Sequence, residues 1–336
     1  MALTQHECFF KKESTWGTAV DATTPTTTIA EVLGVTGQFG YKVDNVVGAV
    51  NPASSAYPTE ISYHEAKVSG SIDFIYQNAM PFVPMMGGVA AAETEEVSAP
   101  YTWTITPSAT AMPFTTSVFV NGTNDKEAQA LGCMATSLSF SMKAGGPVTG
   151  KLDFVAKAID IANNAFTAPT TITLDDAIAW NPKDFTYAIG SITGITYITD
   201  FEFTIKRTAD VGYGLAARTG VIDFPGKFEA VTGSFSAWIQ DSATANELEQ
   251  LVLGGTTINE ALTAQDIVLD YKTYTDTTAD TVKITIDDAI IQSVDATFPL
   301  DTKHLYKFNF SAESVSSVLW ESPYSSITAG FAPSQE

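Results

Sequence analysis

The sequence predicts an all-β protein with minor α content, made of two tandem domains of β-sandwich or partial-barrel type, each with one short flanking helix. Three observations predict this fold class: apolar and polar residues alternate, turn-forming residues separate the alternating segments, and similar segments recur in the second half. Alternation with a period of two is typical of strands with one buried face. It is clearest at Tyr101–Thr106, Ser137–Met142, Phe201–Lys206 and Val282–Ile286.

Residues with turn chemistry separate these segments. Asn121-Gly122, Gly145-Gly146-Pro147 and Pro225-Gly226 each interrupt the alternation, and such combinations favour tight turns. The runs between them are rich in Thr, Val, Ile and aromatic residues, which fit a pleated, half-buried surface. We therefore expect strands along nearly the whole chain.

The clearest helical pattern lies at Thr244–Leu253. Thr244 and Glu247 have the spacing of a capping box, in which each side chain bonds an unpaired amide at the helix start. The apolar residues within Leu248–Val252 fall on one face, and Gly254-Gly255 follows as a stop signal. This pattern predicts a short helix packed on a sheet.

An internal repeat relates the two halves. Val68–Gln77 aligns without gaps with Val231–Gln240. Upstream, the apolar alternation of Tyr41 and Val43 matches that of Phe203 and Ile205. Further matches, at a similar spacing, join Gly87-Gly88 to Gly254-Gly255 and Lys151–Phe154 to Lys307–Phe310. By this alignment the first half also has a short helix before its glycines, around Pro81 and Pro84, where proline is tolerated because first-turn amides lack helical partners.

The near-constant spacing of the matches predicts a duplicated domain. The expected division is an N-terminal arm over residues 1–29, a first copy over 30–165, a linker over 166–186, a second copy over 187–323 and a C-terminal arm over 324–336. The alternative is two unrelated β-sandwiches whose strand patterns happen to align.

Composition excludes several classes of protein. The chain has 336 residues with a formal net charge of −21, which argues against binding of nucleic acid through clustered cations. Apolar stretches end well before the length of about 20 residues that a spanning helix needs, so no membrane association is expected. Met1–Lys12 lacks the layout of a secretory signal, and Cys8 and Cys133 are expected to be reduced.

No pattern of catalytic residues stands out. His6, His64 and His304 are scattered without a metal-binding spacing, and no nucleophile elbow, phosphate-binding loop or dinucleotide fingerprint occurs. Asp175-Asp176 and Asp287-Asp288 lack the alternating oxygen ligands of a calcium loop. We expect no enzymatic activity, no cofactor and no metal site.

Two segments resemble a known family. Lys12–Val20 is similar to the N-terminal signature of phage tail tube proteins, in which a glutamate, a small residue, an aromatic residue and Gly-Thr-Ala follow a short strand. Val68–Phe74 is similar to the strand that precedes their short helix and Gly-Gly, and this strand recurs in the second half, whereas Gly-Thr-Ala does not.

The resemblance implies a structural role in the virion tail of a long, non-contractile-tailed virus, with assembly in the host cytoplasm. It implies homo-oligomeric rings that stack into a hollow tube, through which the viral genomic DNA passes without tight binding, with a tape measure protein as a further partner. We expect three chains to make a pseudo-sixfold ring, because both halves keep the same order of strand, helix and Gly-Gly. Six chains would be needed if the second half were only an outer decoration.

Two long stretches without clear periodicity occupy equivalent places in the halves, Asp44–Glu60 and Arg207–Asp223. Loops of this length in a compact domain are usually functional or disordered, and the tube interpretation makes them contacts between subunits and between rings. The candidate contact residues are Val46, Val47, Tyr57, Tyr213, Leu215 and Arg218. The lumen is expected to carry Asp, Glu, Ser and Thr in excess over Lys and Arg, with a negative potential.

Two other functions remain open at this point. A secreted or surface β-sandwich, such as an adhesin or surface-layer module, would share the Thr-rich strands and the acidic charge, but it should carry a secretion signal. A glycan-active enzyme would need two carboxylates facing each other across a cleft, and the sequence alone does not place such a pair.

Overall fold

Among the residues that it describes, the computed structural model is built mostly of β-strands, with two α-helices and one 3-10 turn. It describes residues 6–13, 15–18, 38–50, 60–90, 101–109, 113–120, 126–162, 179–193, 195, 197–214, 217–239, 242–258, 261–272, 281–297 and 304–322. The predicted all-β class with minor α content is confirmed. Below, the first half means the described residues up to 162, and the second half those from 179 onward.

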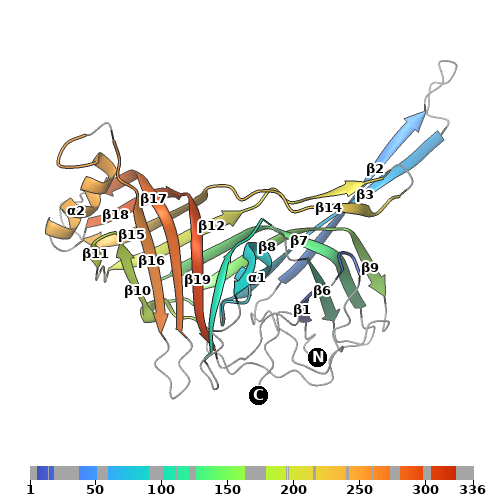
Figure 1. Ribbon diagram of the computed structural model, residues 1–336, viewed down its shortest axis with the longest axis horizontal. Coiled ribbons are helices and arrows are strands. Elements are labelled where there is room, and N and C mark those ends of the chain that lie inside the picture. Colours follow the sequence, from blue (N-terminus) through green and yellow to red (C-terminus); the bar gives the residue numbers. More distant parts are fainter. Residues whose placement is uncertain are drawn as a thin grey trace.

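One large antiparallel sheet runs through both halves, and we call it the shared sheet (Figure 1). Its strands follow one another in space as β2 (Gln38–Val50), β3 (Glu60–Ile75), β8 (Thr149–Ala156), β7 (Lys126–Lys143), β12 (Ile198–Lys206), β15 (Val231–Ile239), β18 (His304–Ala312) and β17 (Thr281–Thr297). The first four strands come from the first half and the last four from the second.

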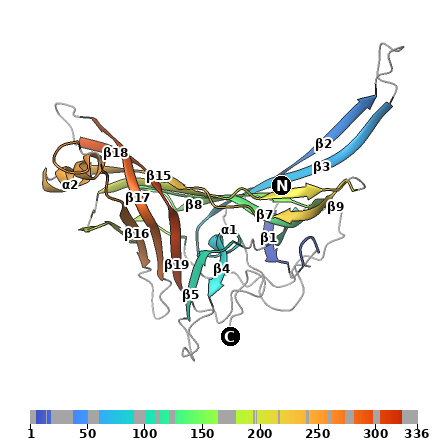
Figure 2. The same cartoon turned by 45° about the horizontal axis from the view of Figure 1, so that its top comes forward.

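Outer strands lie beneath the shared sheet (Figures 1 and 2). In the first half, β1 (His6–Lys12), β6 (Phe114–Val120) and β9 (Ala158–Ala162) join β7. In the second half, β10 (Phe185–Ile189), β11 (Ile192–Thr193), β16 (Gln265–Lys272) and β19 (Ser314–Ser322) join β17. The segment predicted as an N-terminal arm therefore contributes strand β1.

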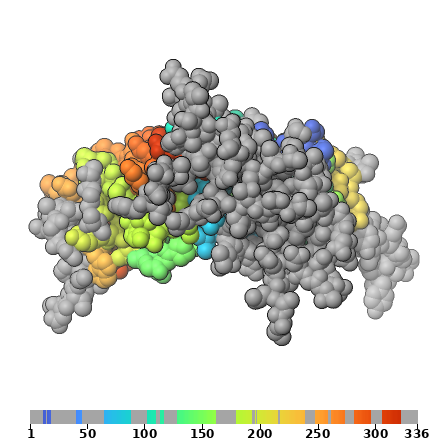
Figure 3. All heavy atoms as spheres, turned by 90° about the horizontal axis from the view of Figure 1, so that it is seen from below, coloured from blue at the N-terminus to red at the C-terminus, as the bar shows by residue number. Residues whose placement is uncertain are grey.

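Strands β4 (Gly87–Ala90) and β5 (Tyr101–Pro107) complete the outer layer, and β5 pairs with β19 of the second half. Seen from below, β10 and β11 (lime) lie beside the orange and red strands of the same half (Figure 3). The 3-10 turn Pro182–Asp184 leads into β10, and the Asn181 side chain accepts a hydrogen bond from the Lys183 amide at its start.

The two helices occupy the predicted places. Helix α1 (Phe82–Met86) follows β3, and α2 (Ser242–Leu253) follows β15. Each ends at a glycine in the left-handed region, Gly87 with φ 79° and Gly254 with φ 75°, as is common at helix C-termini. The Gly-Gly pairs thus stop both helices as the sequence predicted.

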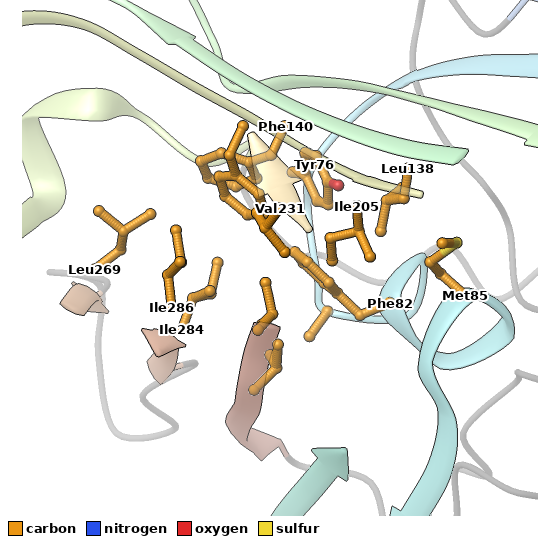
Figure 4. Packing of buried hydrophobic residues seen from close by; sticks show 14 of the residues in the cluster. Tyr76, Phe82, Met85, Leu138, Phe140, Ile205, Val231, Leu269, Ile284 and Ile286 are labelled. Carbon is orange, nitrogen blue, oxygen red and sulfur yellow. The ribbon is translucent and has the colours of Figure 1, made fainter. Parts of the chain in front are cut away.

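A single hydrophobic core lies between the shared sheet and the outer layer and includes residues of both halves (Figure 4). Trp180 lies at its centre: its ring stacks on Tyr76 with centroids 5.2 Å apart and lies 5.2 Å from Tyr271. The Trp180 amide also donates to the Tyr76 carbonyl. Trp180 falls within the segment predicted as a linker, so the end of that segment is part of the core.

The two stretches expected to be loops contain hairpin strands, which corrects that expectation. Asp44–Val50 continues β2 and pairs with β3, so that a long hairpin extends beyond the body of the molecule (Figures 1 and 2). The second stretch forms β13 (Asp210–Tyr213) and β14 (Gly220–Phe224), which pair with each other. Backbone pairing explains how these segments stay ordered without an alternating pattern. We call the two hairpins the first arm and the second arm.

Candidate assembly interface

The two halves meet at a strand junction inside the chain. Strands β7 and β12 pair antiparallel without a register shift, with Phe140 opposite Phe203. The two rings are stacked, with centroids 5.0 Å apart, and both are fully buried. The ladder of the shared sheet therefore passes from the first half to the second without a break.

Corresponding strands of the halves have the same local geometry. Gly70 on β3 lies opposite Phe154, and Gly233 on β15 lies opposite Phe310. At both glycines an added Cβ would clash with the facing phenylalanine ring and with a backbone carbonyl oxygen of the preceding strand. Only glycine permits this close approach, so the repeat in sequence marks a repeated packing arrangement.

The long strands β7 and β17 also correspond. Each bends from the shared sheet into the outer layer, and each has a register shift at the same place, between Ala135 and Ser137 and between Ile291 and Ser293. Just before the bend, Gly132 has φ 62° and Asp288 has φ 50°. The bend thus requires the left-handed region in both strands, which glycine adopts more readily than aspartate.

The outermost strands of the shared sheet are β2 and the last part of β17. Among the described strands, β2 pairs with β3, and Ile290–Thr297 of β17 pairs with β18. At the edge formed by β2, Lys42 and Asp44 form an exposed ion pair of 2.6 Å, and Val43 is 37% exposed. Edge strands present backbone groups that can pair with another chain.

The face of the shared sheet opposite the core is polar. Its carboxylates and lysines interleave across the strands: Asp44 lies opposite Lys67, Asp73 opposite Lys151, Asp200 opposite Lys143, and Asp295 opposite Lys307. Serine and threonine occupy many of the remaining positions, for example Ser137, Ser139 and Ser141 on β7. Opposite charges directly across a ladder stabilise each other modestly, and here they leave the face close to neutral.

The second arm docks on the first half of its own chain. The Tyr213 hydroxyl donates to the Ala66 carbonyl at 3.3 Å, and the Ala66 amide donates to the Arg218 carbonyl at 2.9 Å. The Arg218 guanidinium donates to the Asn45 side-chain oxygen at 3.0 Å. Burial and the carboxylates of Glu65 and Asp210 raise the pKa of Tyr213, so this hydroxyl stays a donor at neutral pH.

The predicted contact residues are placed as follows. Tyr213 and Arg218 make the contacts just described within the chain, and their role between subunits stays a prediction. Val46 and Val47 lie on β2, at its register shift, with side chains outside the described residues. Tyr57 and Leu215 lie outside the described residues altogether, as do 323–336 and most of the predicted linker.

The N-terminal signature forms a buried anchor in the first half. The Glu13 carboxylate accepts hydrogen bonds from the Gly17 amide at 2.6 Å, the Thr115 hydroxyl at 2.7 Å and the Gly132 amide at 2.7 Å. Burial raises the pKa of Glu13 above its ordinary value of 4.5, while these hydrogen bonds and Lys157 oppose the shift. The anchor ties the N-terminal strand to the bend of β7.

Trp16 completes this anchor. Its indole N–H donates to the Gly132 carbonyl at 3.1 Å, and the Lys157 ammonium lies 5.1 Å from its ring centroid. A cation over an aromatic face is attracted by the ring quadrupole. Glu13, Trp16 and Gly17 of the signature therefore have structural roles. The sequence marked these residues only through the family resemblance and did not predict their contacts.

The remaining candidates for a chemical site among the described residues are a metal-binding group, the carboxyl of Asp287 and the thiol of Cys133. No group of three or more His, Cys, Asp or Glu residues among them could hold a metal ion. A hydrogen bond with Asp266 and the surrounding carboxylates raise the pKa of Asp287, which lies half-buried on β17 opposite Ser314. The Cys133 side chain is fully buried. In the part of the chain that is described, neither helix has the length and apolarity needed to span a membrane.

The fold and its surfaces define a class of protein: an all-β chain whose two similar halves share one sheet, with β2 at one edge of this sheet and the last part of β17 at the other. A family model described as Phage tail tube protein matches residues 6–298. The chain therefore belongs to the phage tail tube protein family, and its role is that of a structural component of the virion tail that assembles into a tube. No curated protein matches the chain at a significant level.

Proposed function

We propose that the chain forms the stacked rings of a long, non-contractile phage tail and that the resulting tube conducts the viral DNA during ejection. The observation that carries this proposal is the β7–β12 junction, which joins two similar half-sheets side by side within one chain. Repeating such a junction between chains would close the sheet into a ring. Closure removes exposed strand edges, which otherwise invite aggregation.

We further propose three chains per ring. Both halves contribute four strands in the same order to the shared sheet, and both place a helix and a Gly-Gly stop after the equivalent strand. Each half therefore has the strands of a complete ring segment, and the residue ranges 30–165 and 187–323 are our proposed units. Six halves then make one pseudo-sixfold ring.

The polar face of the shared sheet is our candidate for the lumen wall. It has the expected excess of Asp, Glu, Ser and Thr over Lys, but four of its lysines, Lys67, Lys143, Lys151 and Lys307, stand opposite carboxylates. We therefore propose a nearly neutral lumen in place of the negative one expected from the net charge. Paired lysines attract phosphates weakly, because each carboxylate cancels the field of its neighbour, so DNA can pass without being held.

The arms are our candidates for contacts between rings. The first arm extends beyond the body of its chain (Figures 1 and 2), and paired strands give it the stiffness to reach a neighbouring ring. Before ejection, the lumen would hold the tape measure protein. Assembly would take place in the host cytoplasm.

Cryo-electron microscopy of the purified protein tests this function. We expect hollow tubes with an axial repeat and three chains per ring. Six chains per ring would refute the tandem arrangement, whereas monomers that persist at high concentration and bind glycans would favour a surface module. Tight, salt-sensitive binding of duplex DNA by assembled tubes would contradict the proposed lumen.

A further inference from the structure

We propose that the last part of β17 pairs antiparallel with β2 of a second copy of the chain, in the register that β7 and β12 adopt within one chain. Asp295 then meets Lys42 of the second copy across the seam. This inference rests on the proposed ring and adds the residues and register of its contact.

The correspondence between β2 and β12 follows from their ladder positions. Tyr41 lies opposite Gly70 on β3, and Phe203 lies opposite Gly233 on β15. Gly70 and Gly233 are equivalent, because each is covered by a phenylalanine ring and a backbone carbonyl in the same way. Tyr41 therefore corresponds to Phe203.

The correspondence between β17 and β7 follows in the same way. Ser139 lies opposite Lys151 on β8, and Asp295 lies opposite Lys307 on β18. Lys151 and Lys307 hold the same position in the repeated strand, and the register shifts of β7 and β17 lie at the same distance from them. Ser139 therefore corresponds to Asp295.

The internal junction supplies the register between chains. It pairs Leu138–Phe140 with Phe203–Ile205, with the central residues opposite each other. Transferred to the edge strands β17 and β2, this register pairs Val294–Ala296 of one chain with Tyr41–Val43 of the second copy.

The side chains that this register brings together are complementary, although the register follows from ladder positions alone. Asp295 and Lys42 are the central residues of the two segments, and both are exposed in the single chain. Val43, which is 37% exposed, falls opposite the half-buried Val294. The seam would thus place an acidic group opposite a basic one on the polar face and cover apolar surface on the other face.

The helices are compatible with this pairing. Helix α1 packs beside β7, and α2 packs beside β17 in the corresponding place. Because β7 pairs with β12 in the presence of α1, α2 need not move for β17 to accept a second copy.

Disulfide trapping tests the register. In assembled protein, the double variant Asp295→Cys/Lys42→Cys should form a disulfide between chains under mild oxidation, because directly opposite Cβ atoms lie about 4.5–5.5 Å apart. The matched control Asp295→Cys/Asp44→Cys should not, since diagonal neighbours lie about 7–8 Å apart, beyond disulfide geometry. The unsubstituted protein gives the background from Cys8 and Cys133. A stronger disulfide in the control, or none in the first variant, would overturn the register.

Charge reversal tests the proposed pair. Asp295→Lys and Lys42→Asp should each raise the protein concentration needed for assembly several-fold, because each places like charges across every seam between chains. The double variant should restore assembly. Circular dichroism of the unassembled variants checks that these exposed substitutions leave the fold intact. Single reversals without effect, or a double variant no better than the singles, would refute the pair.

The two proposals fail in different ways. If the unsubstituted protein forms neither rings nor tubes, the proposed function fails. If it forms tubes but the disulfide forms in another register, the function stands and the inference about β17 and β2 is wrong.

Discussion

The two halves of the chain share a strand framework but differ in their connections. The shared-sheet strands, the bend in the long strand and the helix stop are repeated, whereas the first arm is long and extends outward and the second is short and docks on the first half. The difference shows that ladder geometry and close backbone packing set the framework. The connections have diverged where they meet different neighbours.

Removing the aromatic ring that joins the two halves in the core should have the largest effect on stability. Trp180→Ala should lower the free energy of unfolding by about 3–5 kcal/mol, because the indole packs against Tyr76 of one half and Tyr271 of the other. Since the core is shared, chemical denaturation followed by fluorescence and by circular dichroism should still show one transition. Two separate transitions would mean that the halves fold independently. Trp180→Phe should cost less, because it keeps an aromatic ring and removes a buried N–H that lacks a partner among the described residues.

Equivalent glycines in the two halves should respond alike. Gly70→Ala and Gly233→Ala should each lower stability by about 1–3 kcal/mol, because the added methyl group overpacks against a phenylalanine and a carbonyl. Urea titrations of both variants measure the costs. A large loss at one position with none at the other would show that the repeated packing is superficial.

Substitutions at the bends of the two long strands should change the stability of the protein in opposite directions. Gly132→Ala should destabilise the protein, because its backbone has positive φ and an added Cβ would lie 2.8 Å from the Lys157 Cβ. Asp288→Gly should stabilise it by about 0.5–1 kcal/mol, since glycine relieves the left-handed backbone and removes a charge near Asp287. Thermal unfolding of both variants checks the signs, and equal signs would contradict a common bend.

The anchor in the first half should produce a small pH dependence. Burial raises the pKa of folded Glu13 above its ordinary value of 4.5, so its contribution to stability is full below that value and is lost as pH rises through the folded pKa. Glu13→Gln lacks this loss. The stability of the variant relative to the original protein should therefore rise with pH from below 4.5 upward in urea titrations; a fall would show that the ionised carboxylate is favoured by folding.

The framework could be predicted from the sequence because its causes are local. Alternation placed strands, and the capping box of Thr244 and Glu247 predicted α2 within two residues of its start. The alignment of Gly70 with Gly233 marked corresponding ladder positions. Each of these features depends on neighbours close in sequence or on a residue type that few environments tolerate.

The arms, the shared core and the seam could not be predicted in this way. Asp44–Val50 became a strand through pairing with β3, not through alternation. Trp180 stands in the segment predicted as a linker, and its burial depends on Tyr76 and Tyr271, which are distant in sequence. Nothing in the sequence around Lys42 or Asp295 indicates that the two residues pair. Their pairing follows only when the internal repeat is combined with the register of the β7–β12 junction.

The β7–β12 junction also affects how the proposed ring responds to dilution. Covalently joined partners meet at an effective concentration set by the linker, which does not fall when the protein is diluted. Seams between separate chains obey mass action instead. Internal and external seams would alternate around the ring, so dilution would open every second seam. A tube built this way would disassemble into whole chains whose central seam is intact, and never into single domains.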